Sequence, residues 1–277
     1  MIDRIEILNL LISAVNVSIR AGALIMDVYN SDDFQVNLKS DKTPLTLADR
    51  LAHDIIKNDL SKTLIPVLSE EGRNIVYEER KGWEYFWIVD PLDGTKEFIK
   101  RNGEFTVNVA LIHNGYPLLG VVYVPVTNEL YFSFIPEGAY KVANLLPQKD
   151  ANYSYDDLIT KANPLPFKTN RDCIVVVESR SHVSPETVEY IEQLKGRFGN
   201  LDSISRGSSL KMCMIAEGLA DVYPRLSLSS EWDTAAGQAI VEGAGFQVLT
   251  YDTRERMQYN KEELINPWFI VKGKVAL

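Results

Sequence analysis

The stretch Trp87-Ile-Val-Asp90-Pro-Leu-Asp93-Gly-Thr95 joins a hydrophobic strand to an acidic turn. The apolar run before Asp90 predicts a buried strand, and Pro91 removes a backbone N–H and bends the chain. Asp93 follows Asp90 by three residues, so both carboxylates can converge on one point beyond the strand end. The residues from Gly94 onward open a short helix, and the first N–H groups of a helix bind anions well. One loop therefore offers carboxylates to a hard cation and amides to phosphate oxygens.

Taken alone, this stretch fits a second interpretation equally well, an acidic turn whose aspartate caps a helix. Two further segments favour a metal site. Leu68-Ser-Glu-Glu71 places paired acids at the end of another predicted strand. Glu231-Trp-Asp-Thr-Ala-Ala-Gly237 puts an acid in the first turn of a helix whose small residues permit close packing. Because Mg²⁺ prefers oxygen ligands and often bridges carboxylates to a substrate phosphate, three acid-bearing segments together indicate a magnesium site.

The segments around these acids alternate between helical and strand patterns. Apolar residues recur at helical spacing from Ile5 to Met26, and the pattern returns over 46–63. Segments rich in β-branched and aromatic residues predict an antiparallel meander at 106–112, 118–124 and 130–135. Later elements are expected as strands at 173–177 and 268–271 and as helices starting near residues 184, 208 and 232. This mixed order predicts layered α/β or α+β architecture.

The overall composition limits the classes of partner. The 38 acidic residues outnumber the 29 basic ones, which gives a formal charge of −9 and argues against binding to a nucleic-acid backbone. An acidic protein that binds phosphate must overcome repulsion locally, and bound divalent cations can do so. Only two cysteines occur, which suits a reducing cytoplasm. No signal peptide and no transmembrane segment are expected, because charges interrupt the N-terminus early.

Four acid-bearing features, taken in chain order, resemble the signature of the inositol monophosphatase superfamily of Mg²⁺-dependent, lithium-sensitive phosphatases. They are Asp49 in a helix, Glu70-Glu71, Asp90 to Thr95 and Trp232 to Gly237. The resemblance extends from the first helix to Asn266-Pro267. It implies a layered α-β-α-β-α sandwich of the inositol monophosphatase and fructose bisphosphatase type, with the active site in a cleft between two lobes.

The resemblance also implies a ligand set for two or three Mg²⁺ ions. Glu70, Asp90 and the carbonyl of Leu92 would hold one metal, and Asp90, Asp93 and Asp233 would hold a second. A third, weaker metal would lie near Glu70. Two metals acidify a bound water and stabilise the attacking and leaving oxygens, so no covalent phosphoenzyme is needed. Inhibition by Li⁺ is expected with this metal set.

Two further residues receive roles as catalytic groups through the same resemblance. Asp49 and the hydroxyl of Thr95 would orient the attacking water, and the backbone at Gly94 and Thr95 would contact phosphate. None of the three histidines lies in a segment with a catalytic pattern.

Other segments resemble the bacterial 3′(2′),5′-bisphosphate nucleotidases of the CysQ type. These segments are Asp93 to Asn108, Ser179 to His182, Gly207 to Cys213, Ala216 to Gly218 and Tyr223 to Arg225. That family removes the 3′-phosphate from adenosine 3′,5′-bisphosphate, a by-product of sulfate assimilation, and leaves AMP. 3′-Phosphoadenosine 5′-phosphosulfate is a second candidate substrate. The implied substrate contacts are Gly94, Thr95, Ser179, Arg180, Ser181, His182, Ser208, Lys211, Arg225 and Asp233.

The resemblance assigns these contacts to two lobes. We predict an N-terminal α+β lobe at 1–150 with most metal ligands, and a C-terminal α/β lobe at 151–277 with the nucleotide-contacting residues and Asp233. The polar segment 149–170 would connect them, or else form a surface loop within one domain. Lys211 and Arg225 would balance a distal 5′-phosphate, since arginine can bind it through two parallel hydrogen bonds.

One departure affects the substrate side. Where relatives carry a Gly-Pro-Thr-like turn, this chain has Leu226-Ser-Leu-Ser-Ser230. An inositol or sugar monophosphate phosphatase of the same superfamily is therefore the first alternative, and a non-catalytic binder of phosphorylated ligands is the second. The resemblance favours a monomer in the cytoplasm and allows peripheral association with the cytoplasmic face of the inner membrane.

Overall fold

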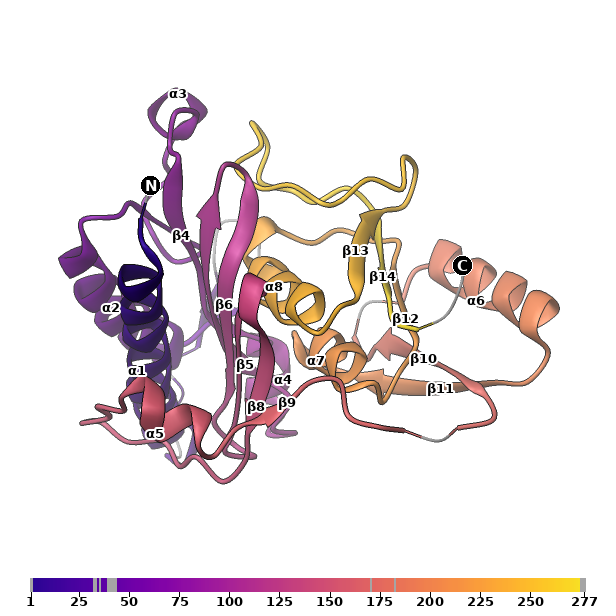
Figure 1. Cartoon of the computed structure of the whole chain (residues 1–277), viewed down its shortest axis with the longest axis horizontal. Coiled ribbons are helices and arrows are strands. Elements are labelled where there is room, and N and C mark those ends of the chain that lie inside the picture. The colour runs from indigo at the N-terminus through magenta and orange to yellow at the C-terminus, as the bar shows by residue number, and fades with distance from the viewer. Residues whose placement is uncertain are drawn as a thin grey trace.

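The two large β-sheets and three helical layers stack in the order α-β-α-β-α (Figure 1). The computed structural model describes residues 2–31, 34, 36–38, 44–169, 171–181 and 183–274. Figure 1 shows α1 and α2 outside the larger sheet, α7 and α8 between the sheets, and α6 beyond the smaller sheet. The predicted layered sandwich is confirmed.

The larger sheet has seven strands in the order β3-β4-β5-β6-β7-β8-β9. Its neighbours are antiparallel except β3 and β4, which run parallel. The predicted meander is therefore present as β5, β6 and β7. The strands are β3 (Val67–Ser69), β4 (Tyr85–Asp93), β5 (Thr106–His113), β6 (Tyr116–Val124), β7 (Glu129–Phe134), β8 (Gly138–Val142) and β9 (Asn163–Pro164).

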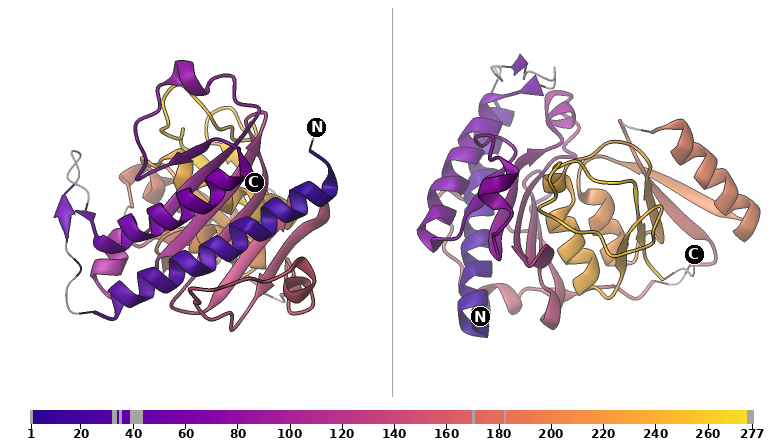
Figure 2. Two further views of the ribbon diagram at one scale, coloured as in Figure 1. Left: turned by 90° about the vertical axis from the view of Figure 1, so that its left-hand side faces the viewer. Right: turned by 90° about the horizontal axis from the view of Figure 1, so that it is seen from above.

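Two long helices cover the outer face of this sheet, as the turned views in Figure 2 show. Helix α1 (Arg4–Tyr29) begins at a capping box formed by Asp3, and α2 (Leu47–Leu60) begins at one formed by Thr46. Among the described residues, α1 alone has the length and apolar composition of a membrane span. However, 61% of its most apolar window is buried inside the molecule. It packs on α2 and on the sheet, as a core helix does.

The smaller sheet has the strand order β11-β10-β12-β14-β13. Its strands are β10 (Ile174–Ser179), β11 (Leu201–Arg206), β12 (Val222–Arg225), β13 (Gln247–Thr250) and β14 (Phe269–Lys272). Ser184 caps α6 (Pro185–Phe198), with Pro185 at the first helical position as predicted. Helices α7 (Leu210–Glu217) and α8 (Ala235–Gly243) lie between the sheets, where a continuous apolar cluster includes residues of both.

The segment expected to connect two lobes contains structure of its own. A capping box between Ser154 and Asp157 starts the short helix α5 (Tyr155–Ile159). The next residues form β9, which pairs with β8 of the larger sheet. The remaining short elements are β1 (Asn37–Leu38), β2 (Pro44–Leu45), α3 (Tyr77–Arg80) and α4 (Thr95–Ile99).

Helix α8 packs closely on the inner face of the larger sheet. A Cβ atom added to Gly120 of β6 would lie 2.6 Å from the Ala239 Cβ and 2.7 Å from the Ala236 carbonyl oxygen. Small residues on both elements therefore set the distance between α8 and the sheet. This distance matters for function, because Asp233 lies in the turn that leads into α8.

We expect Gly120→Ala to lower the free energy of unfolding by about 1–3 kcal/mol, because the added methyl group overpacks this interface. Chemical denaturation followed by circular dichroism measures the change. Gly196→Ala is the matched control: Gly196 lies within α6, and nothing lies within 4 Å of its added Cβ. The control should raise stability by up to about 1 kcal/mol, because alanine favours the helix. Equal stability of Gly120→Ala and the wild type would contradict the close packing of α8.

Candidate active site

A cavity of about 300 Å³ lies between the two sheets and receives residues from both. It contains all but three of the residues that the sequence singled out. The predicted residues that line it are Glu70, Asp90, Leu92, Asp93, Gly94, Thr95, Ser179, Ser181, Ser208, Lys211, Arg225 and Asp233. Of the other three, Asp49 contacts Thr95, Arg180 points elsewhere, and His182 lies outside the described residues.

The parallel pairing of β3 and β4 brings the first two acids together. Ser69 pairs with Val89, and the Glu70 N–H donates to the Val89 carbonyl at 3.1 Å. Glu70, directly after β3, and Asp90, within β4, therefore lie side by side. Asp90 is only 2% exposed, and its pKa is raised well above the usual range. The causes are removal from water and then repulsion by Glu70, Asp93 and Asp233.

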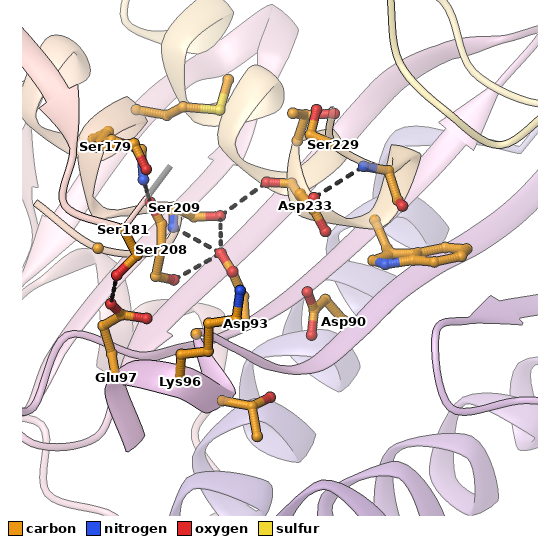
Figure 3. A pocket seen from close by; sticks show the side chains of 18 of the residues that line it. Asp90, Asp93, Lys96, Glu97, Ser179, Ser181, Ser208, Ser209, Ser229 and Asp233 are labelled. Carbon is orange, nitrogen blue, oxygen red and sulfur yellow. Dashed lines mark hydrogen bonds between the residues drawn. The ribbon is translucent and has the colours of Figure 1, made fainter. Parts of the chain in front are cut away.

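In the described part of the chain, all the hydrogen bonds that fix the Asp93 carboxylate reach one of its two oxygens. Its Oδ2 accepts from the Ser208 hydroxyl at 2.7 Å, and from the backbone and hydroxyl of Ser209 at 2.8 and 2.9 Å. The Asn108 amide adds a longer contact of 3.3 Å. Figure 3 shows the bonds from Ser208 and Ser209 to Asp93. Because Oδ2 is saturated, Oδ1 is the oxygen that is left for a cation.

Asp233 lies at the end of the 3₁₀ turn Glu231–Asp233, which leads into α8. Its Oδ2 accepts from the Ser230 N–H at 2.9 Å, within a capping box that starts a single 3₁₀ turn. The Ser209 hydroxyl also donates to the Asp233 carbonyl at 3.0 Å, so one serine contacts both Asp93 and Asp233. Removal from water and the charge of Asp93 raise the pKa of Asp233 to about 7. Figure 3 shows Asp90, Asp93 and Asp233 around a common space.

The donor set of this cluster fits divalent cations. Asp90, Asp93 and Asp233 form no ion pair with any lysine or arginine among the described residues, although they are drawn together out of water. Such like charges are stabilised by protons or by a bound cation. In the described part of the chain, no three His, Cys, Asp or Glu side chains are arranged so that they could hold a metal ion together. The fit therefore rests on the type and charge of the donors.

Asp49 and Thr95 form a pair beside the acid cluster. Asp49 Oδ2 accepts from the backbone and hydroxyl of Thr46, which orients the carboxylate at the start of α2. Its Oδ1 accepts from the Thr95 hydroxyl at 3.0 Å. Thr95 lines the cavity, and Asp49 is almost completely buried behind it. The pair is placed to hold a polar atom at the cavity wall.

Two neighbouring cations of the cavity lining, Lys211 and Arg225, are buried or half-buried, and the exposed Lys96 also lines the cavity. Lys211 is 5% exposed, donates to the Ser208 carbonyl at 2.5 Å and lies over the Tyr223 ring. Burial lowers the pKa of Lys211 to about 8. The Arg225 Nη2 donates to the Leu228 carbonyl at 2.6 Å, while its buried Nε has no hydrogen-bond partner among the described residues. This wall can bind an anionic group.

The segment that departs from the family pattern borders this wall. Leu226 is buried and Leu228 is 76% exposed, while Ser229 and Ser230 line the cavity. Asn266 fixes the segment, because its N–H and amide donate to the carbonyls of Ser229 and Ser230 at 2.8 and 2.6 Å. The unusual sequence therefore presents small hydroxyl groups to the cavity.

Arg180 differs from its neighbours Ser179 and Ser181, which line the cavity. Arg180 does not line it. Its guanidinium forms two parallel hydrogen bonds with Glu104, at 2.6 and 2.7 Å. This placement does not support the expected direct contact between Arg180 and substrate. Local sequence could not indicate the pairing, because Glu104 lies 76 positions away.

Several site residues were missed by the sequence analysis. Ser209, Asn108 and Glu97 lie at the cavity or hold its acids, and Glu97 accepts a hydrogen bond from Ser181. Ser209 stands next to the predicted Ser208, so the doubled serine was the available signal. Asn108 lies opposite Asp90 in the β4–β5 register, which the sequence does not reveal.

The comparison with known proteins agrees with this geometry. The model of the inositol monophosphatase family matches residues 7–275. A Shigella flexneri protein named 3′(2′),5′-bisphosphate nucleotidase CysQ is 44% identical over 260 residues, which cover 91% of this chain and 94% of that protein. The protein of the same name from Escherichia coli K12 is 42% identical over 255 residues, with the same two coverages.

A solved structure supports the same grouping. The crystal structure of CysQ from Bacteroides thetaiotaomicron, described as a bacterial member of the inositol monophosphatase family, matches with a TM-score of 0.91. It is 48% identical and the match covers 99% of this chain and 100% of that one. With its sandwich fold and its acid-lined cavity, the chain belongs to the inositol monophosphatase family and is a phosphoric monoester hydrolase.

Proposed function

We propose that this phosphatase removes the 3′-phosphate of adenosine 3′,5′-bisphosphate in a Mg²⁺-dependent reaction, giving AMP and phosphate. One observation carries the proposal: a single cavity is lined both by an acid cluster and by two neighbouring cations that are buried or half-buried. The acids suit metal ions and a phosphate to be cleaved. Lys211 and Arg225 suit a second phosphate, which a monophosphate substrate would lack.

Glu70, Asp90, Asp93, Asp233 and the Leu92 carbonyl would hold two or three Mg²⁺ ions. When bound, the ions supply Lewis-acid activation of water and stabilisation of charge on the phosphate. Li⁺ is expected to inhibit. The chain's own contribution is to hold the acids in place, since Ser208 and Ser209 fix Asp93 and the Ser230 N–H fixes Asp233.

Asp49 and Thr95 orient the attacking water in this proposal. The Thr95 hydroxyl donates to Asp49, so its oxygen keeps lone pairs that can accept a hydrogen bond from a water in the cavity. The carboxylate of Asp49 is in turn held by Thr46, which keeps the pair in one orientation. The backbone at Gly94 and Thr95 contacts the phosphate oxygens.

Lys211 and Arg225 bind the 5′-phosphate, and Ser208 adds a hydroxyl beside them. Ser179 and Ser181 line the cavity on the nucleoside side, where His182 is also expected. The names and identities of the bacterial relatives support this substrate. The same contacts suit 3′-phosphoadenosine 5′-phosphosulfate, and both substrates place the enzyme in sulfur metabolism.

Two lobes form the site in this proposal: residues 1–150 supply most metal ligands, and 151–277 supply Asp233 and the nucleotide contacts, although β9 of the second range pairs within the larger sheet. We further propose a cytoplasmic monomer, which the resemblance of the sequence to the CysQ type favours.

A phosphate-release assay tests the substrate. Turnover of adenosine 3′,5′-bisphosphate should depend on added Mg²⁺, should fall with Li⁺, and should exceed turnover of inositol 1-phosphate, because inositol 1-phosphate offers no second phosphate to Lys211 and Arg225. Faster release from inositol 1-phosphate would identify an inositol phosphatase instead. Absence of release from both would indicate a binder of phosphorylated ligands.

Asp93→Asn should lower kcat/KM by about 100-fold and leave the fold intact, because it removes charge from a metal ligand whose hydrogen bonds remain largely satisfiable. Circular dichroism and the same phosphate-release assay measure the two effects. Asp252→Asn, in an exposed loop away from the cavity, is the control and should behave as the wild type. Near-normal turnover by Asp93→Asn would rule out the metal assignment.

Lys211→Ala should raise KM about tenfold for adenosine 3′,5′-bisphosphate and much less for adenosine 3′-monophosphate, because it removes a charged donor from the 5′-phosphate. Equal losses for the two substrates would show that Lys211 does not contact the 5′ group.

The pH dependence gives a second measurement on Lys211. Its amine is protonated below about 8 in the free protein, so kcat/KM for the bisphosphate should fall as the pH rises through about 8. Lys211→Arg should move this decline to higher pH, because arginine stays charged. An unchanged profile would assign the decline to another group.

A further inference from the structure

Glu104 lies where loops from both sheets meet, although no predicted role included it. It follows α4 and precedes β5, and its backbone N–H donates to the Asn102 side chain at 2.9 Å. Its side chain is 16% exposed. The same short segment of chain therefore carries Asp93, Thr95 and Glu104.

The carboxylate of Glu104 holds two loops of the smaller sheet at once. Oε2 accepts from Arg180 Nε at 2.6 Å and from the backbone N–H of Gly207 at 2.7 Å, while Oε1 accepts from Arg180 Nη2 at 2.7 Å. Arg180 Nη2 also donates to the Ser205 carbonyl at 3.0 Å. Bidentate arginine–carboxylate contacts fix direction as well as distance. Although partial burial acts to raise it, the pKa of Glu104 is lowered by these donors.

The backbone of Glu104 is packed between two glycines. A Cβ atom on Gly94 would lie 2.9 Å from the Glu104 carbonyl oxygen, and one on Gly207 would lie 3.0 Å from the same atom. Three backbone segments therefore meet with no room for a side chain. One begins the helix at Thr95, and another leads directly into the Ser208–Ser209 turn that holds Asp93 Oδ2.

A second acid repeats the connection. Glu97 of α4 is 4% exposed and accepts a hydrogen bond from the Ser181 hydroxyl. The loop at 179–181 is thus held by Glu97 through Ser181 and by Glu104 through Arg180. The loop at 205–209 is held by Glu104 through Gly207. Of these two acids, only Glu104 contacts both loops through hydrogen bonds.

We propose that Glu104 is a positioning residue for catalysis, which fixes the Ser208–Ser209 turn and through it Asp93, and which places the 179–181 wall by holding Arg180. Arg180 then acts on the cavity through Glu104 and not by direct contact with substrate. This inference rests on the proposed function for its substrate but not for its geometry.

A double-mutant cycle tests the proposal. We expect Arg180→Ala to lower kcat/KM for adenosine 3′,5′-bisphosphate about tenfold in the wild type and less than about twofold in a Glu104→Ala background. An equal loss in both backgrounds would mean that Arg180 contacts substrate independently, and would overturn the proposal. Arg206→Ala is the matched control, since Arg206 lies 3.9 Å from Glu104 and is 43% exposed. It should change kcat/KM by less than about twofold.

Magnesium binding gives a readout that needs no substrate. By isothermal titration calorimetry with MgCl₂ alone, Glu104→Ala should weaken binding about tenfold, because the turn that orients Asp93 loses its anchor. Arg180→Ala, which leaves the bond from Gly207 to Glu104, should bind Mg²⁺ nearly as the wild type does. Unchanged Mg²⁺ binding by Glu104→Ala would overturn the positioning role.

Two further measurements separate positioning from a loss of folding. Glu104→Gln keeps the shape and an oxygen for the Gly207 N–H but loses the charge-assisted pair, so it should retain Mg²⁺ binding while losing kcat/KM. If Glu104→Ala fails to fold by circular dichroism, the cycle is measured with Glu104→Gln, and additive losses there would refute the pairing. Failure of the wild type to use the bisphosphate would refute the proposed function alone, because the MgCl₂ titration would still report on Glu104.

Discussion

Repulsion among carboxylates that are held together out of water is the constraint on which the rest of this structure depends. Asp90 is almost fully buried beside Glu70, with Asp93 and Asp233 close enough to raise its pKa further. A core would exclude such a group of charges unless protons or cations balanced them. The acids lie beside the end of β3 and along the last residues of β4, where their side chains line a cavity between the two large sheets.

The surrounding elements hold these acids against that repulsion. Serines on the turn before α7 saturate one oxygen of Asp93, and Ser209 also contacts the backbone of Asp233. Asp233 reaches the cavity because α8 lies flat on the larger sheet, with Gly120 leaving room for its alanines. Packing in the middle layer and charge at the cavity are thus parts of one arrangement, in which a small displacement of α8 or of the serine turn would move a metal ligand.

The cations of the cavity matter because the whole chain has a formal charge of −9. Lys211 and Arg225 put positive charge into the cavity beside the acid cluster, where a phosphorylated ligand would otherwise meet repulsion. Lys211 is buried and contacts Tyr223, so its position is set before substrate arrives. The Glu104–Arg180 pair lies outside the cavity and binds the two sheets together behind it. In the positioning role that we propose for Glu104, this salt bridge supports the cavity without lining it.

The sequence by itself determined the features that depend on chain neighbours. The helix caps at Thr46 and Ser184, the meander of β5 to β7 and the acids at strand ends all follow from local pattern, and the family signature joined them into one cluster. Only the tertiary structure decided contacts between distant segments. Two hydrogen-bond partners of Asp93, Ser208 and Ser209, lie 115 and 116 positions away. Arg180 pairs with Glu104, so it does not line the cavity as its neighbours Ser179 and Ser181 do. Strand β9 pairs with β8 within a stretch whose sequence is typical of a linker. Local sequence carries no record of these pairings, because they arise only when the two sheets close on the middle helices.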